Sequence, residues 1–179
     1  MSEQPSGDDL IGGIHRQVAH LGWLVGQWRG IGKGSDPQGG QFKFEQVLEF
    51  AHDQRPFLEY RSISWILDED ENRLRPSHTE QGYFRGLPDN GVEAVIANAS
   101  GYGEAWFGRA EVASIENAQI TSAKLILEPS GLAKTPSATP IAITERMYGI
   151  RDGKLLMTFD MGVDKQPVES HIWLILERV

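Results

Sequence analysis

The chain has 179 residues, with 17 lysines and arginines against 25 aspartates and glutamates, so its formal net charge is −8. This length suits one domain with a full hydrophobic core. The acidic balance disfavours nucleic acids and anionic membranes as main partners. The sequence contains no cysteine, which excludes disulfides, thiolate metal ligands and cysteine nucleophiles. Chemistry in this protein therefore depends on histidine, carboxylate or hydroxyl side chains, or on a cofactor.

The location of the protein is predicted from its apolar segments. Residues 1–9 are polar and acidic, without the basic start and apolar run of a secretory signal. The longest apolar runs, such as Ile172–Leu176, fall short of the roughly 18 residues that cross a bilayer. We therefore expect a cytoplasmic protein that does not span a membrane.

The N-terminal segment, residues 1–20, is predicted to contain one short helix. Apolar residues recur at helical spacing between Asp8 and about Leu24, behind an acidic pair that suits a helix N-terminus. Gly12 and Gly13 lie inside this stretch and weaken the helix. We expect a single helix that ends before the first strand.

Beyond Trp28 the apolar residues alternate with polar ones, which is the pattern of half-buried strands. Asp89-Asn90-Gly91 and Asp152-Gly153 are typical of tight hairpins, because these residues tolerate the positive φ that such turns require. The stretch from Pro129 to Pro140 has the composition of a loop. The predicted strands cover Phe42–Phe50, Phe57–Leu67, Gln81–Arg85, Val92–Asn98, Gly103–Val112, Gln119–Glu128, Ile141–Ile150, Lys154–Val163 and His171–Arg178.

About ten strands with one short helix predict an all-β fold, because parallel strands would need a crossover segment, usually a helix, between each pair. A sandwich fits the same periodicity, but the order of hairpins favours a single antiparallel up-and-down barrel, as in lipocalins and fatty-acid-binding proteins. Closure into a barrel removes the unpaired strand edges. A barrel of this size encloses one small ligand. We assign residues 21–179 to the barrel domain and expect Trp28 to plug its base.

Two histidines stand out as candidate ligands. His171 opens the last predicted strand, and His78 precedes the strand that begins at Gln81. Residue type and position leave two interpretations open for each of them, because a single histidine is more often a hydrogen-bonded surface residue than a ligand.

Several separated segments occur in the same order as in a known family. They are Leu21–Gly32 with its tryptophans and glycines, His78–Arg85, Val95–Asn98, Ser100–Gly101 before a strand with Glu104, and Met161 placed ten residues before His171. On these segments the sequence resembles the nitrobindin family of haem-binding β-barrels, which are also called peroxynitrite isomerases. The resemblance extends from about Leu21 to Val179, which is nearly the whole chain.

The resemblance implies that the cofactor is haem b and that His171 is the proximal ligand of its iron. It also implies that His78, Asn98 and Met161 line the cofactor cavity, and Trp28 is included in the cofactor-binding set. The implied activity is isomerisation of peroxynitrite to nitrate by ferric haem, and the implied gas ligand of ferrous haem is nitric oxide. A neutral imidazole is a suitable iron ligand in a chain without cysteine.

Other functions fit the same sequence. A carrier of an apolar small molecule, such as a fatty acid, would need a charged residue inside the cavity, for which Arg61, Arg85 and Arg146 are candidates. A haem-based store or sensor of nitric oxide without turnover would use the same residues as the enzyme, and a barrel without haem is a further alternative. Trp173 would compete with haem for the interior if it turned inward beside His171.

Overall fold

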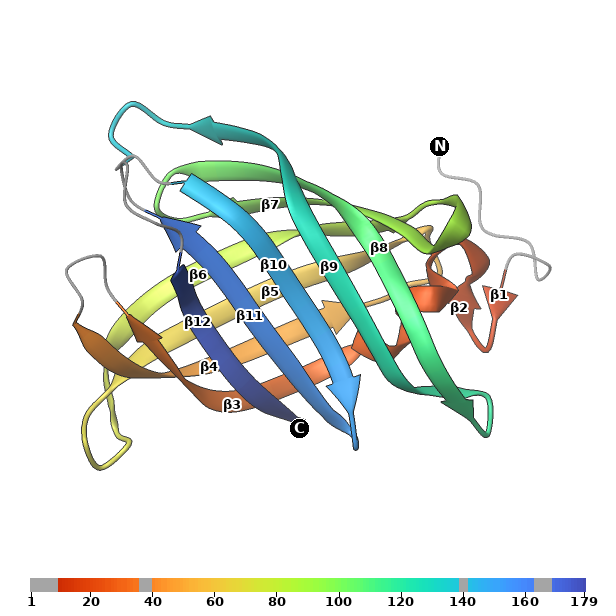
Figure 1. Cartoon of the computed structure of the whole chain (residues 1–179), viewed down its shortest axis with the longest axis horizontal. Coiled ribbons are helices and arrows are strands. Elements are labelled where there is room, and N and C mark those ends of the chain that lie inside the picture. Colours follow the sequence, from red (N-terminus) through yellow and green to blue (C-terminus); the bar gives the residue numbers. More distant parts are fainter. Residues whose placement is uncertain (1–9, 36–39, 139–141, 163–168) are drawn as a thin grey trace.

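The computed structural model describes residues 10–35, 40–138, 142–162 and 169–179. Its strands close into one antiparallel barrel, in which each strand pairs with the next in sequence and the last pairs with the first (Figure 1). The all-β barrel predicted from the sequence is confirmed. The barrel strands are β3 (Gly26–Ser35), β4 (Gln41–Ala51), β5 (Phe57–Leu67), β6 (Arg73–Gly86), β7 (Gly91–Asn98), β8 (Tyr102–Glu116), β9 (Gln119–Lys134), β10 (Ala142–Arg151), β11 (Lys154–Gly162) and β12 (Glu169–Arg178).

The strand β9 is longer than its sequence composition indicated. It continues beyond Glu128 to Lys134, so the prediction of a loop beginning at Pro129 was wrong for this part. Pro129 pairs with Trp106 where the register between β8 and β9 shifts by one residue. Proline is tolerated at such irregularities, because no regular ladder hydrogen bond is required of its missing N–H.

The predicted helix between Asp8 and Leu24 is only half correct. Its first part is a small hairpin of β1 (Leu10–Ile11) and β2 (Ile14–His15), and its second part is the 3₁₀ helix η2 (Arg16–Leu24). Gly12 and Gly13 adopt φ of +59° and +84°, which is the left-handed region that a tight turn requires. Asp8 lies outside the described residues.

The helix η2 covers one end of the barrel, which we call the base. Its buried side chains are Val18, Leu21, Trp23 and Leu24. Trp28, fully buried at the start of β3, donates a hydrogen bond from its indole N–H to the Leu24 carbonyl at 2.8 Å. Gln17 ties η2 to the sheet, because its amide donates to the Gly86 carbonyl at 2.9 Å. Trp28 therefore plugs the base, as expected.

The opposite end of the barrel, where the turns joining β5 to β6 and β7 to β8 lie (left in Figure 1), is called the mouth. The interior between the two ends is filled by the inward side chains of alternate strand positions. Toward the mouth, Phe42, Ile66 and Ile172 are half-buried. Half-buried apolar side chains also border the core at the base, among them Val25, Val112 and Ile120.

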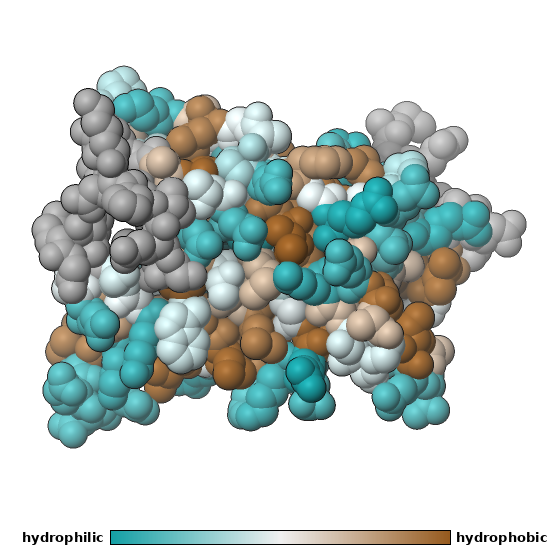
Figure 2. Space-filling view, viewed as in Figure 1, coloured by the Kyte–Doolittle hydropathy of each residue, from teal (hydrophilic) through white to brown (hydrophobic). Residues whose placement is uncertain are grey.

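The outer surface carries hydrophilic and hydrophobic residues side by side (Figure 2). Trp173 and Ile175 belong to it, with 51% and 46% of their surface exposed on β12. Their neighbours Leu174 and Leu176 are buried. Trp173 thus faces outward and does not compete for the interior. No helix in the described part of the chain is long and apolar enough to cross a membrane.

We predict that Gly108→Ala lowers the free energy of unfolding by about 1–3 kcal/mol. A Cβ at Gly108 would lie 1.8 Å from the Ile126 carbonyl oxygen, so β8 and β9 would have to separate, whereas a Cβ at Gly103 on the same strand meets no atom within 4 Å. Urea unfolding measures both effects. Gly103→Ala is the matched control and should change stability by less than about 0.5 kcal/mol; equal losses in the two variants would contradict the packing argument.

Candidate functional site in the barrel

His78 lies on β6 where the pairing with β5 is irregular. The register slips by one residue between Ile63 and Trp65 of β5, so β6 contains an additional residue at this point. The Ser64 hydroxyl accepts a hydrogen bond from the His78 N–H at 3.1 Å and donates one to its carbonyl oxygen at 3.4 Å. Irregularities of this kind bend a strand and re-aim a side chain, and they are frequent at barrel rims.

His171 lies at a second irregularity, on β12. The register between β11 and β12 slips by one residue between Phe159 and Asp160, and His171 is the additional residue of β12 there. The side chains of His171 and Met161, both singled out from the sequence, lie outside the described part of the structure. Their backbone places them at the mouth end of β12 and β11.

A third register shift, on β10, brings Arg146 into the interior. The pairing with β11 slips by one residue between Ile143 and Glu145. Because of this slip, Ile143 and Arg146, three residues apart, both face the interior, with exposed fractions of 7% and 0%. The other two arginines considered as interior charges, Arg61 and Arg85, are exposed. Arg146 is therefore the arginine of these three that enters the barrel.

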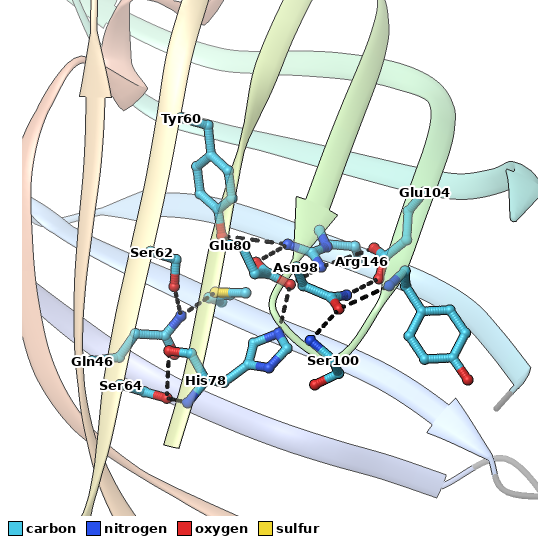
Figure 3. Close-up of polar contacts among 12 residues, drawn as sticks. Gln46, Tyr60, Ser62, Ser64, His78, Glu80, Asn98, Ser100, Glu104 and Arg146 are labelled. Carbon is cyan, nitrogen blue, oxygen red and sulfur yellow. Dashed lines mark hydrogen bonds and ion pairs between the residues drawn. The ribbon is translucent and has the colours of Figure 1, made fainter. Parts of the chain in front are cut away.

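Arg146 forms a two-pronged ion pair with Glu80 of β6 (Figure 3). Its two terminal nitrogens lie 2.9 and 2.8 Å from the two carboxylate oxygens. Tyr60 donates its hydroxyl proton to the same carboxylate at 2.8 Å. A second carboxylate, that of Glu104 on β8, lies 3.4 Å from the guanidinium. Charge-assisted, two-pronged pairs of this type fix both partners in one geometry.

Aromatic side chains enclose the guanidinium. Its central carbon lies 4.6 Å from the centre of the Phe159 ring and 5.2 Å from that of Trp106. The Tyr148 hydroxyl accepts from Arg146 at 3.3 Å, and the Trp106 indole N–H donates to Glu104 at 3.0 Å. Ring faces attract cations, so this arrangement stabilises the buried charge beyond the ion pair.

The pKa values of the two carboxylates are shifted in opposite directions. Burial raises the pKa of Glu80, but the charge and hydrogen bonds of Arg146 and the hydrogen bond from His78 lower it by more, so the net pKa lies well below its usual value. Burial raises the pKa of Glu104, the longer contact with Arg146 opposes this effect, and the charge of Glu80 adds to it, so the net pKa is raised. Glu80 is thus held as a carboxylate more firmly than Glu104.

His78 joins this network through its ring. Its Nε2 lies 3.2 Å from a carboxylate oxygen of Glu80. The His78 side chain is 40% exposed, whereas that of Glu80 is 4% exposed. An ionised carboxylate can only accept hydrogen bonds, so the proton of this bond is on Nε2. The histidine at the mouth is therefore connected to the buried ion pair.

Asn98 forms hydrogen bonds both within the turn between β7 and β8 and with the buried network. Its amide nitrogen donates to Glu104 at 3.0 Å. Its amide oxygen accepts from the backbone N–H groups of Ser100 and Tyr102 at 3.1 and 3.3 Å. Asn98 holds Glu104 and the turn in place, while Glu104 contacts Arg146 directly.

The structure brings together some of the residues chosen from the sequence. His78 and Asn98 meet through the network, and the backbone of His171 lies at the same end of the barrel, whereas Trp28 lies apart at the base. No group of three histidine or acidic side chains that could hold a metal ion occurs among the described residues. The residues that sequence reasoning left without a role are Tyr60, Glu80, Glu104, Trp106 and Tyr148. Alternate positions of a strand face the same side. The position of Glu80, two residues after His78, is therefore the signal in the sequence that could have indicated their contact.

Comparisons with known proteins agree on one family. Residues 17–178 match the family model described as "THAP4-like, heme-binding beta-barrel domain". A protein named peroxynitrite isomerase from Nocardioides sp. is 32% identical over 170 residues, which cover 95% of this chain and 98% of that protein. A ferric nitrobindin-like protein from Streptomyces avermitilis is 35% identical over 136 residues, covering 76% of this chain and 67% of that protein.

A solved structure has the same fold. The crystal structure of Rv2717c from M. tuberculosis superimposes with a TM-score of 0.79, at 27% sequence identity. The match covers 93% of this chain and 99% of that chain. The similarity therefore includes almost all of both barrels.

We predict that Arg146→Met lowers the free energy of unfolding by about 3–5 kcal/mol, because it leaves Glu80 and Glu104 buried without their cation. Arg85→Met is the matched control: Arg85 pairs with Glu93 at 3.0 Å, but its side chain is 60% exposed, and such pairs contribute less than about 1 kcal/mol. Urea unfolding compares the two variants. Similar losses in both would show that the interior pair has no special importance for stability.

We predict that the stability difference between the wild type and Glu80→Gln decreases on acidification. The folded-state pKa of Glu80 is lowered, so its stabilising contribution is complete above the unfolded-state pKa of about 4.3 and is lost as the pH falls below that value. Urea unfolding at a series of pH values between about 7 and 3 measures the difference. A difference that stays constant over this range would refute the lowered pKa.

Proposed function

The chain belongs to the family of THAP4-like haem-binding β-barrel domains, and from this membership we propose that it binds haem b through His171 and isomerises peroxynitrite to nitrate. Two of its relatives bear the names peroxynitrite isomerase and ferric nitrobindin-like protein. The cytoplasmic location expected from the sequence stays a prediction.

The observation that carries this proposal is the position of two histidines at strand irregularities. His78 and His171 belong to β6 and β12, and each lies where one strand contains an additional residue near the mouth. A bulge frees a residue from strict inward and outward alternation, and bulges are frequent beside active sites. The barrel thus departs from regular pairing at the two side chains best suited to an iron-containing cofactor.

The described interior near the mouth is lined by apolar side chains, which are the residue types that a haem pocket needs. Near the mouth it presents Phe159 and Met157 from β11 and Phe44 from β4, all buried, and the half-buried Phe42 and Ile172 beside them. The chain has no cysteine, so imidazole is its strong ligand for haem iron. The outward position of Trp173 leaves its bulk outside the interior. The residue types near the mouth therefore support the proposal of haem.

When bound, ferric haem would supply a Lewis-acidic iron that promotes the rearrangement of peroxynitrite. In the proposal the chain contributes His171 as iron ligand, and Met161 as a further cavity residue. The apolar side chains of β11 and β4 would contact the cofactor and exclude water from it. His78 offers a polar group at the mouth, while Asn98 acts indirectly, by holding Glu104.

A fatty-acid carrier is less well supported. The interior cation that it would need is Arg146, but both of its terminal nitrogens already bind Glu80 at 2.8 and 2.9 Å. A fatty-acid carboxylate would have to displace a buried carboxylate from that pair. The nitric-oxide store or sensor uses the same residues as the enzyme, so activity measurements distinguish the two.

We predict that the purified protein binds hemin with near-equimolar saturation and that His171→Ala weakens this binding by more than about 100-fold, because outer-shell substitutions at such sites already cost 10–100-fold. Titration of hemin, followed by the Soret band, measures both affinities. His78→Ala should have a milder effect. His52→Ala is the matched control, since His52 bonds to His15 at the base; full hemin affinity in His171→Ala would overturn the ligand assignment.

We predict that the hemin-loaded protein accelerates the decay of peroxynitrite to nitrate and that the haem-free protein does not. Stopped-flow decay near neutral pH should depend linearly on ferric haem concentration and should be abolished by cyanide. A decay rate equal to that of buffer, with a normal haem spectrum, would refute catalysis and favour the store or sensor.

A further inference from the structure

His78 is held at both its backbone and its ring. Ser64 bonds the backbone N–H and C=O of His78 at 3.1 and 3.4 Å. Glu80 accepts from the ring Nε2 at 3.2 Å. Figure 3 shows one ring nitrogen directed at Glu80 and the other away from it. A side chain that is 40% exposed is thus anchored at its ring by a buried carboxylate.

Glu80 in turn is fixed by groups that have no exposed surface or almost none. Arg146 bonds both carboxylate oxygens, and Tyr60 bonds one of them. The exposed fractions of Arg146, Tyr60 and Glu80 are 0%, 2% and 4%. Every described partner of this carboxylate is a donor, so its orientation and its charge state are both determined. The ring of His78 therefore rests on a rigid support.

Stability alone does not explain this support. A buried ion pair is often no more stabilising than apolar side chains of similar volume. The network also reaches the mouth at a histidine, which an apolar core would not orient. Glu45, which pairs with Arg29 and Arg73 on the outer side of the sheet, is a carboxylate of the same kind away from His78 and therefore a suitable comparison.

We propose that Glu80 is a positioning residue, which binds the Nε2–H of His78 and thereby presents the Nδ1 edge of that ring to the ligand in the mouth of the barrel. The identity of this ligand as haem rests on the proposed function. The positioning itself is a property of the haem-free barrel. Glu80 acts through His78, and Arg146 acts through Glu80.

The first test uses haem-free protein and nuclear magnetic resonance of histidine side chains. In the wild type, the Nε2–H of His78 should give an observable resonance, because its hydrogen bond slows exchange with water. Glu80→Gln should abolish that resonance or shift it strongly, and Glu45→Gln, the matched control, should leave it unchanged. An unaltered resonance in Glu80→Gln would overturn the proposal, whether or not the protein binds haem.

The second test is a double-mutant cycle on hemin affinity, measured by Soret titration. We expect Glu80→Gln to weaken binding by about 10–100-fold, the range for groups that orient a cofactor contact, and Glu45→Gln to change it by less than about threefold. In the His78→Ala background, Glu80→Gln should have no additional effect, because its influence passes through the missing ring. Additive losses in the double variant would show an independent effect and refute positioning.

A second substitution covers the case in which Glu80→Gln does not fold. Glu80→Asp keeps a negative charge beside Arg146 but withdraws it by one methylene from His78. It should reproduce the loss of the Nε2–H resonance with a smaller loss of stability. Retention of the wild-type resonance in a folded Glu80→Asp protein would count against the proposal. Failure of hemin to bind the wild type would refute the proposed function and leave the resonance test intact.

Discussion

The positive charge of Arg146 lies inside the barrel, and the residue has no exposed surface. Transfer of a guanidinium from water to such a place is costly, and the cost is offset only where carboxylates and further hydrogen bonds surround it. Glu80 and Glu104 reach it from β6 and β8, across the interior from β10. The ion pair therefore connects strands that are not neighbours in the sheet, and His78, Asn98 and Tyr60 bond to its carboxylates.

The topology of the barrel could be predicted because it depends on local turn chemistry. Asp89 and Asn90 adopt φ of 57° and 58°, and Asp152 and Gly153 adopt 52° and 74°. These are the conformations that tight hairpins require and that these residue types tolerate. Alternation of apolar residues then determined which face of each strand is buried. Together the two signals predicted an antiparallel sheet of successive hairpins and favoured a barrel over a sandwich.

The candidate site could be predicted only in part, because it depends on register. Alternation from Ile143 would have turned Arg146 outward, and only the shift in pairing with β11 brings it inside. Such a shift is a property of two strands and cannot be read from one of them. Glu80 follows His78 by two residues, but its partner Arg146 lies 66 residues further along the chain. The family resemblance singled out the histidines, and the packing shows what supports one of them.

The closing contact between β12 and β3 joins the two ends of the described barrel. Non-local pairing of this kind forms late, since it requires closure of a long loop. A nascent chain on the ribosome cannot make this contact until β12 has emerged. Until then one edge of β3 is unpaired and can form hydrogen bonds with other chains. His171 lies on the strand that closes the sheet. If it is the iron ligand, cofactor capture follows the pairing of β12 with β3, and the appearance of bound haem reports that the barrel has closed.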